Sequence, residues 1–255
     1  MRIVECTQGE PDWLKVRCGL ITASRMADAL DYTKKGIEGA DRRNYRIELL
    51  TERLTGRANE HYVSRDMELG REYEPYAISA YEQEKRVMAR SVGFVLHPTL
   101  DCSGASPDSL VGDKGGVEAK CPRPTTHMRW KEEARIQKAE GKPVTVPEVH
   151  QPQCLWVMKC CELDWVDFIS FCPIFPKGLD RHIVRMFRDD ERISKIESEV
   201  IKLDGEVKAA IDYWQQFLKI PDVSELEPPP QESAPEISHW AAEFANFTGM
   251  DEIPL

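Results

Sequence analysis

The stretch SGASPDSLVGDKGGVEAKCP, Ser103 to Pro122, decides the fold and the chemistry predicted for this chain. It has the pattern of two strand segments separated by turn residues at Asp113 to Gly116. Asp108 follows a proline, and Glu118 comes ten residues later in the middle of the second segment. Because side chains alternate between the faces of a strand, Glu118 and Lys120 point the same way and the residue between them faces the opposite layer. A tight turn therefore brings two carboxylates and an amine together.

The predicted hairpin is rich in oxygen ligands. Two converging carboxylates make a hard site suited to Mg²⁺ or Mn²⁺, to which the carbonyl of Ala119 can add a ligand. For a lone E-x-K motif, a solvated salt bridge beside a turn aspartate is the ordinary explanation. Here the Pro-Asp pair, the ten-residue gap and the E-x-K motif occur together with apolar flanks, and Glu74 lies on a preceding predicted helix. The combination favours a metal site and matches the PD-(D/E)xK nuclease signature.

The segments around the hairpin predict an α/β fold in which a central mixed β-sheet is flanked by helices. Strands are expected at 91–98, 101–112, 115–121, 164–171 and 181–187, the first three as an antiparallel meander. Helices are expected after Pro11, after a turn at Gly19 with Thr22 or Ser24 as its cap, at 44–56 with Gly56 as its end, and at 66–85, 125–142, from about 148, and 189–218.

Two of these helices have apolar faces at helical spacing. On 66–85 the stripe is Leu69, Tyr73, Tyr76, Ala77 and Ala80. Gly70 on its flank predicts that the helix approaches a neighbouring strand closely, which brings Glu74 of the helix toward that strand. On 189–218 the expected buried face is Ile193, Ile196, Val200, Leu203, Val207, Ala210, Ile211, Trp214 and Phe217.

Charge is distributed unevenly along the chain of 255 residues. From Ile220 onward there are eight acids and no Lys or Arg, and removing those eight from the net charge of −10 leaves −2. We therefore expect a folded domain at 1–219 and an acidic, Pro-rich tail at 220–255. Within the domain two basic clusters could meet DNA phosphates or form solvated helix faces: Lys34, Lys35, Arg42, Arg43 and Arg46, and then Arg123, Arg129, Lys131, Arg135, Lys138 and Lys142.

The tail has two features of its own. Ile237, Trp240, Ala241 and Phe244 recur at helical spacing, which allows either a short docking helix or plain disorder. The final MDEIPL resembles the acidic, apolar-ended tip of bacterial single-stranded-DNA-binding proteins, so we expect a tail able to dock on a partner.

Composition also excludes several classes of protein. No apolar run approaches the roughly 20 residues of a membrane helix, and the first residues lack a signal peptide's apolar core, so a cytoplasmic protein is expected. The eight cysteines have no C-x-x-C spacing, which favours buried thiols over a zinc site. An iron–sulfur cluster stays an alternative, although no three cysteines are close together in the sequence.

Five motifs in order resemble a known family. WLKVRCGLITASR, MELGREYEPYA, GASPDSL, GVEAKCP and HQPQCLWVM are similar to the motifs of the YqaJ-type viral recombinases, the family of bacteriophage lambda exonuclease, over about Trp13 to Phe171. The resemblance implies a restriction-endonuclease-like core that works as a ring-shaped homotrimer on double-stranded DNA ends. It implies 5′ to 3′ exonuclease activity that leaves 3′ overhangs for a single-strand annealing protein, with two Mg²⁺ ions per site and Mn²⁺ as the expected substitute.

The resemblance also implies roles for individual residues. Asp108, Glu118 and the Ala119 carbonyl match metal ligands, Glu74 matches the acid contributed by a helix, and Lys120 matches the catalytic lysine. Arg17 and Ser24 match residues that hold the 5′-terminal phosphate of the DNA in that family.

This chain departs from the family's Y-x-x-Q-x-Q element at two positions. Gln153 matches the glutamine that orients the water or the scissile strand, but His150 replaces its tyrosine and Leu155 its second glutamine.

Three other functions stay open: an endonuclease with the same core, a single-strand repair nuclease, and a non-catalytic scaffold that binds DNA ends. The intact acid and lysine set argues against the scaffold.

Overall fold

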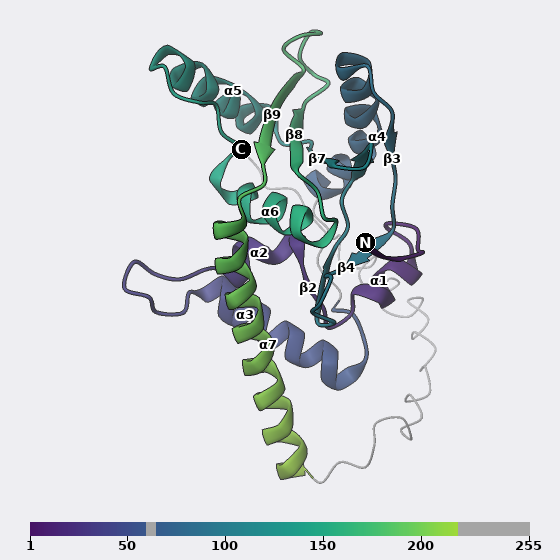
Figure 1. Ribbon diagram of the computed structural model, residues 1–255, viewed down its shortest axis with the longest axis vertical. Coiled ribbons are helices and arrows are strands. Elements are labelled where there is room, and N and C mark those ends of the chain that lie inside the picture. The colour runs from purple at the N-terminus through teal and green to yellow at the C-terminus, as the bar shows by residue number, and fades with distance from the viewer. Residues whose placement is uncertain (60–64, 219–255) are drawn as a thin grey trace, which may run out of the picture. The chain divides into compact units, whose positions relative to one another are not determined.

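The computed structural model describes residues 1–59 and 65–218, as a mixture of helices and short strands (Figure 1). In chain order the elements are β1 Arg2–Val4, α1 Pro11–Arg17, β2 Ile21–Thr22, the 3₁₀ turn η1 Ala23–Arg25, α2 Met26–Ala29, α3 Ala40–Thr55, α4 Arg65–Lys85, β3 Ala89–Arg90, β4 Phe94–Leu96, β5 Ser103–Ala105, β6 Ser109–Val111, β7 Gly115–Lys120, α5 Pro124–Ala139, the 3₁₀ turn η2 Glu148–His150, α6 Gln151–Cys160, β8 Trp165–Phe171, β9 Arg181–Phe187 and α7 Asp190–Leu218.

The larger sheet has five strands in the order β3-β6-β7-β8-β9. Within it β6 and β7 form the predicted antiparallel hairpin, and β8 runs parallel to β7, with Glu118 opposite Phe168. Gly115 begins β7 directly against Trp165, where a Cβ atom would overlap the indole ring. The pairing is thus mixed, and β8 and β9 match the predicted segments 164–171 and 181–187 to within one residue.

The smaller sheet has the order β1-β4-β5-β2 and is also mixed. It shows that the predicted single strand 101–112 is wrong, because this segment forms two strands in two sheets, β5 and β6. The break falls at Ser106, Pro107 and Asp108. Proline has no N–H to donate to a strand ladder, so pairing ends there and the chain passes from one sheet to the other. Asp108 therefore lies at the crossover between the sheets.

Helices α4 and α6 pack on opposite faces of the larger sheet. Ala77 and Tyr81 of α4 pack with Val117 and Ala119 of β7. The other face belongs to the main core, which contains residues of α6 together with Val166 and Phe168 of β8. The alternation of side chains in β7 therefore directs Ala119 to the α4 layer and Glu118 to the opposite face, as the sequence predicts.

Helix α4 corrects two details of the predicted stripe. Tyr76 is 63% exposed, so the buried face runs through Ala77 and Tyr81 instead. Gly70 is not a point of close approach, because a Cβ atom there would meet nothing within 4 Å. The contact that fixes α4 on the sheet lies further along the helix, where the Tyr81 hydroxyl donates to Asp167 Oδ2 of β8 at 2.8 Å.

The segment after α1 is less helical than expected. Gly19 makes the predicted turn with φ +71°, but β2 pairs with β5 before the helical residues begin. The helical part consists of η1 with three residues and α2 with four. Neither Thr22 nor Ser24 caps it, since η1 has no side-chain cap bond. Ser24 therefore does not stand at the N-terminus of a long helix, whose dipole would favour an anion there.

The long helix α7 closes the main core. Ile193, Ile196, Val200, Leu203 and Val207 are buried as predicted. Trp214 is 43% exposed, so the last turns of the expected face do not reach the core. Phe217 has no described side chain, and the tail 219–255 with its expected docking helix lies outside the described residues.

Candidate nuclease active site

Asp108 and Glu118 come together at the end of the β6–β7 hairpin. Asp108 Oδ2 accepts a hydrogen bond from the backbone N–H of Ala119 at 2.6 Å, which locks the aspartate across the two strands. Glu118 is 0% exposed. Lys120, on the same face two residues later, donates from Nζ to Glu118 Oε1 at 2.5 Å. The hairpin thus gathers two acids and the amine from one short stretch of sequence.

Gln153 approaches the same carboxylate from α6. Its Nε2 donates to Glu118 Oε1 at 2.5 Å, so Lys120 and Gln153 share one oxygen. The other oxygen, Oε2, is buried and has no hydrogen-bond partner among the described residues. A buried charged oxygen without a partner is costly, and native structures rarely retain one without a ligand or water.

Glu74 joins this group from α4. It is half-buried, and burial together with the charge of Glu118 raises its pKa, against the opposing charges of Lys120 and Arg71. Pro75 follows it inside the helix. Proline cannot donate to the carbonyl four residues earlier, so it weakens the helix at the turn that carries Glu74. Such a costly residue inside a helix is typical of a functional site.

The acids repel one another electrostatically. Burial, followed by the charge of Glu118, raises the pKa of Asp108 well above its usual range. Burial alone would lower the pKa of Lys120, but attraction to Glu118 and Asp108 outweighs it, and the net shift is upward. The sequence left this balance open. In the metal-free fold this upward shift favours the ammonium form of Lys120, which can orient a nucleophile or neutralise charge.

The donor set fits a divalent cation, although the acids do not form a ready-made cage. Within residues 1–59 and 65–218, no group of three or more His, Cys, Asp or Glu side chains is arranged to hold a metal ion unaided. The unpartnered Glu118 oxygen and the raised pKa values of Asp108 and Glu74 are nevertheless what a missing positive charge would relieve. Oxygen-only ligands favour Mg²⁺ or Mn²⁺.

Arg17 and Ser24 also lie together. Arg17 Nη2 donates to Ser24 Oγ at 3.1 Å and to Thr22 Oγ1 at 3.4 Å, and Nη1 donates to Ser106 Oγ at 3.3 Å. Its guanidinium carbon lies 4.1 Å from the ring centroid of Trp13. Within the described residues no carboxylate forms an ion pair with Arg17, and burial lowers its pKa. A partly buried cation ringed by hydroxyl groups is a chemical match for an anion.

One pocket of about 630 Å³ connects this arginine to the acid cluster. It is lined by Arg17, Ser24, Arg25, Arg71 and Lys120, among others. Arg17, Ser24 and Lys120 therefore open into a common space, and Lys120 carries the connection to the acids through its bond to Glu118. Among the described residues, this is the arrangement that carries the functional argument.

Sequence reasoning missed Ser106, Thr22 and Arg71. Ser106 stands two residues before Asp108 in the quoted SPD motif, and Thr22 stands in the ITAS motif, so both were visible. Their role required the pairing of β2 with β5, which places the two segments side by side. Arg71 gave no signal in the sequence beyond its place one helical turn before Glu74.

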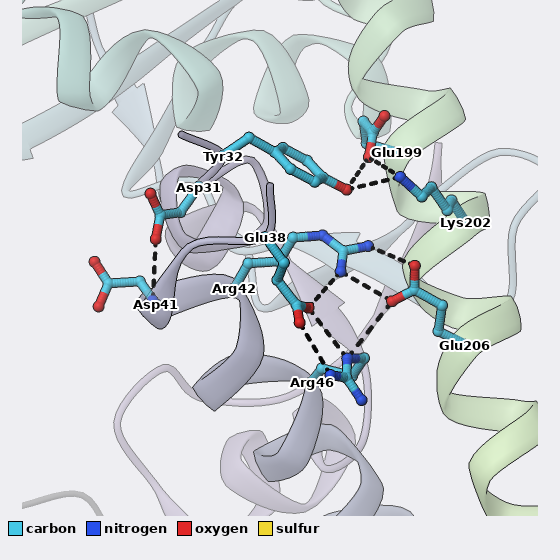
Figure 2. Close-up of polar contacts among 9 residues, drawn as sticks. All are labelled: Asp31, Tyr32, Glu38, Asp41, Arg42, Arg46, Glu199, Lys202 and Glu206. Carbon is cyan, nitrogen blue, oxygen red and sulfur yellow. Dashed lines mark hydrogen bonds and ion pairs between the residues drawn. The ribbon is translucent and has the colours of Figure 1, made fainter. Parts of the chain in front are cut away.

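Two of the five residues of the first basic cluster are structural. Figure 2 shows Arg42 between Glu38 and Glu206 of α7, at 2.7 and 2.9 Å. Arg42 is 2% exposed, and Arg46 also pairs with Glu38 at 3.1 Å. Arg42 and Arg46 are therefore neutralised in the contact between α3 and α7. Lys34 and Lys35 remain exposed.

Several residues of the second basic cluster, on and beside α5, are also engaged in contacts within the protein. Lys131 Nζ donates to the carbonyl of Arg181 at 2.7 Å, and Arg135 pairs with Glu132 at 2.6 Å. Lys142 pairs with Glu140 at 2.8 Å. These contacts leave less positive charge on α5 than the sequence suggests.

The two departures in the glutamine element have structural explanations. His150 stacks on Phe168 and meets Trp130 edge-on, with centroid distances of 5.2 and 5.4 Å. Burial lowers its pKa to about 4, so the ring is neutral. Leu155 is fully buried in the core. Of this element, Gln153 is the residue that contacts the acid cluster.

All eight cysteines are free thiols, but the expectation that they are buried holds only for Cys154, Cys160, Cys161 and Cys172, and the other four are partly exposed. In the part of the chain that the structure describes, no helix has the length and apolar character needed to cross a membrane.

Comparison with known proteins bears on this site. The sequence matches the YqaJ-like viral recombinase domain over residues 12–164, which is more than half of the chain. The chain belongs to this family. The matched range contains all the predicted site residues, from Arg17 to Gln153.

Solved structures agree with the family assignment. The chain is similar to the alkaline exonuclease LHK-Exo from Laribacter hongkongensis, with 36% identity, a TM-score of 0.70, and coverage of 82% of this chain and 97% of that one. The same enzyme in complex with dAMP matches with a TM-score of 0.71 at the same identity and coverage.

A phage-related exonuclease from Haemophilus somnus 129PT shares the fold at 14% identity, with a TM-score of 0.60 and coverage of 76% of this chain and 96% of that one. Comparison with curated proteins gives no match. The predicted α/β class with a PD-(D/E)xK core is therefore confirmed, with its strands divided between two mixed sheets.

Proposed function

We propose that this chain is a divalent-metal-dependent exonuclease that degrades one strand of linear double-stranded DNA from the 5′ end to mononucleotides. One observation carries the proposal: a single pocket runs from Arg17, a cation without a carboxylate partner among the described residues, to Lys120 of the acid cluster. An anion-binding end beside a hydrolytic centre suits an enzyme that holds a terminal phosphate. The similarity to solved exonucleases supports the coarser part of the proposal, that the chain is an exonuclease.

The terminal-phosphate end is assigned to Arg17 and Ser24, joined by Ser106. The guanidinium offers a planar set of donors, which suits phosphate better than a point charge does. Its hydrogen bonds to the hydroxyl groups of Ser24 and Ser106 hold it in place over Trp13. Gripping the newly formed end after each cut accounts for 5′ to 3′ polarity.

The hydrolytic end is assigned to Asp108, Glu118, Glu74 and the Ala119 carbonyl as ligands for two Mg²⁺ ions, with Mn²⁺ as the substitute. Bound there, the ions would supply activation of the attacking water and neutralisation of the leaving oxygen. Lys120 holds a positive charge beside the scissile phosphate. Gln153 fixes the rotamer of Glu118 through their 2.5 Å hydrogen bond and so leaves Oε2 free to bind.

Digestion of duplex DNA in Mg²⁺ tests the reaction and its polarity. The substrates are linear DNA with a 5′ phosphate, linear DNA with a 5′ hydroxyl, and closed circular DNA. Wild-type protein is expected to release mononucleotides from linear DNA, faster with the phosphate, and to leave the circle intact. Lys120→Ala should lose about 10²- to 10⁴-fold in rate. Lys114→Ala, on the exposed turn of the same hairpin, is the matched control and should retain full activity.

Arg17→Ala gives the second arm of this experiment. It should reduce the preference for the 5′ phosphate by about tenfold or more, the usual weight of a charged hydrogen bond. Cleavage of the closed circle would instead indicate an endonuclease, and digestion restricted to single strands would indicate a repair nuclease. Tight end binding with no digestion by the wild type would indicate a scaffold.

The assembly and partners follow from the family resemblance. We expect a homotrimer around DNA, a single-strand annealing protein as partner, and residence in the cytoplasm of a bacterial host cell. Light scattering of the purified protein should give three times the chain mass. Deleting Asp251 to Leu255 should weaken capture of the annealing partner while the nuclease rate stays intact, and unchanged capture would remove the tail from this role.

A further inference from the structure

The cations that line the pocket differ in how they are neutralised. Arg25 is held by Asp28 and, through two bonds of 2.8 and 2.9 Å, by Glu48. Lys120 is paired with Glu118. Both charges are therefore committed within the protein. Two guanidinium groups of the pocket, those of Arg17 and Arg71, have no carboxylate within ion-pair distance among the described residues.

Arg71 differs from Arg17 in its surroundings. Its side chain is exposed, and within residues 1–59 and 65–218 it has no hydrogen bond or ion pair. Its described electrostatic partner is Glu74, whose pKa it pulls down. No residue that the structure describes fixes the guanidinium, and Arg71 lines the pocket together with Lys120 and Asn59.

The position of Arg71 on α4 sets where this charge can act. Residues three apart lie on one face of a helix, so Arg71 stands one turn before Glu74 on the same side. Pro75 has no N–H for the Arg71 carbonyl, so the helix is weakened between the two functional side chains. The arginine therefore projects from a defined point beside the acid cluster.

The charge balance gives this arginine a purpose. Asp108, Glu118 and Glu74 outnumber Lys120, so before any cation binds, the hydrolytic end of the pocket repels a DNA phosphate. A second positive charge on the approach to this end offsets the repulsion. Arginine suits the task because its donors match two phosphate oxygens at once.

We propose that Arg71 binds a backbone phosphodiester of the degraded strand, interior to the terminal phosphate that Arg17 holds. The proposal rests on the function proposed above and adds a second anion site to it. Arg17 reads the chemical state of the 5′ end, whereas Arg71 grips a group that every DNA strand carries. The two arginines should therefore differ in what their loss does to substrate preference.

Binding in EDTA tests this assignment without cleavage. Fluorescently labelled duplexes with a 5′ phosphate or a 5′ hydroxyl are titrated with wild type, Arg71→Ala and Arg17→Ala over a series of salt concentrations. Arg71→Ala should weaken binding of both duplexes about tenfold, preserve their affinity ratio, and reduce the slope of log affinity against log salt by about one. Arg17→Ala should bind the two duplexes with equal affinity.

Two further variants control for folding and for general charge. Arg71→Lys keeps the charge without the fork and should recover part of the affinity. Lys85→Ala removes an exposed cation from the opposite end of α4, about four turns away, and should change neither affinity nor slope. Equal melting temperatures for Arg71→Ala and wild type are expected because the side chain is exposed.

The outcomes separate this proposal from the function itself. Unchanged affinity and slope in Arg71→Ala would overturn it, and so would a loss confined to the phosphorylated duplex, since Arg71 would then belong to the terminal site. A wild type that degrades DNA while Arg71→Ala binds normally refutes this inference alone. A wild type that binds DNA through Arg71 but never cuts it refutes the nuclease and leaves the phosphate contact standing.

Discussion

Replacing Asp108 with asparagine separates cation binding from folding. The substitution keeps the shape of the side chain and an oxygen that can accept from the Ala119 N–H, the 2.6 Å bond that ties β6 to β7. It removes one carboxylate of an acid group whose members are buried close together and repel one another, because burial and then the charge of Glu118 raise the pKa of Asp108. Without divalent cations, Asp108→Asn should melt at or slightly above the wild-type temperature.

Adding a divalent cation should reverse this order. If Mg²⁺ at about 10 mM binds the wild type with a dissociation constant on the order of 1 mM, mass action adds about 1.4 kcal/mol to the folded state. A domain of this size shifts its Tm by about 2–4 °C per kcal/mol, which gives a rise of about 3–6 °C. Asp108→Asn lacks the carboxylate assigned to the cation, and its Tm should rise by less than about 1 °C.

Differential scanning fluorimetry in EDTA and in Mg²⁺ measures both shifts, with Ca²⁺ as a further oxygen-seeking cation. Asp113→Asn, on the exposed turn of the same hairpin, is the matched control and should show the full wild-type rise. An equal rise in Asp108→Asn would refute the assignment of this carboxylate to the cation. A Tm for Asp108→Asn far below that of the wild type in EDTA would refute the claim that the acids repel one another in the metal-free fold.

Three other perturbations follow from the structure. Tyr81→Phe removes the 2.8 Å donor to buried Asp167, which should lower Tm by several degrees for about 1.5–3 kcal/mol and raise the Mg²⁺ concentration needed for half-maximal activity, because α4 then carries its acid less firmly. Pro75→Ala restores a helix donor and should raise Tm while reducing activity. Burial lowers the pKa of His97 to about 4, so stability should fall as pH drops from 6.5 to 4, by about 3 kcal/mol in all, and His97→Gln should flatten this dependence in thermal melts.

Each of these has a control and a contrary result. Tyr76→Phe changes an exposed tyrosine of the same helix and should leave both Tm and Mg²⁺ dependence unaltered. Pro75→Ala with higher Tm and full activity would mean that the weakened turn has no functional use. The folded state loses stability as the pH falls from 6.5 to 4 because the unfolded chain binds a proton at His97 that the folded protein excludes. Thermal melts whose pH dependence is the same in His97→Gln would assign the acid sensitivity to other groups.

Several features were accessible from the sequence because neighbouring residues determine them. The β6–β7 hairpin needs only a turn and alternation, and these place Glu118 and Lys120 on one face. Strands β8 and β9 carry apolar runs whose bounds are local. The break at Pro107 was also present in the sequence, but the chain to either side of it looks like one strand, and the divided sheets were missed.

Other features depended on partners distant in the chain. Arg42 belongs to a basic cluster that could meet DNA phosphates, yet Glu38 and Glu206 neutralise it in the interface with α7 (Figure 2). Trp214 fits the apolar period of its helix, but the core ends before it reaches that turn. Periodicity reports which face of a helix is apolar and not how far the neighbouring layer extends.

By itself, the sequence determined the reactive hairpin, because one turn and a period of two bring Asp108, Glu118 and Lys120 together whatever the rest of the chain does. It did not determine the pocket. Only the tertiary structure brings Gln153 onto Glu118, joins Ser106 to Arg17, and leaves Arg17 and Arg71 without carboxylates of their own among the described residues. Whether a charge is free or neutralised depends on which groups meet it in space, and the order of residues along the chain does not record that.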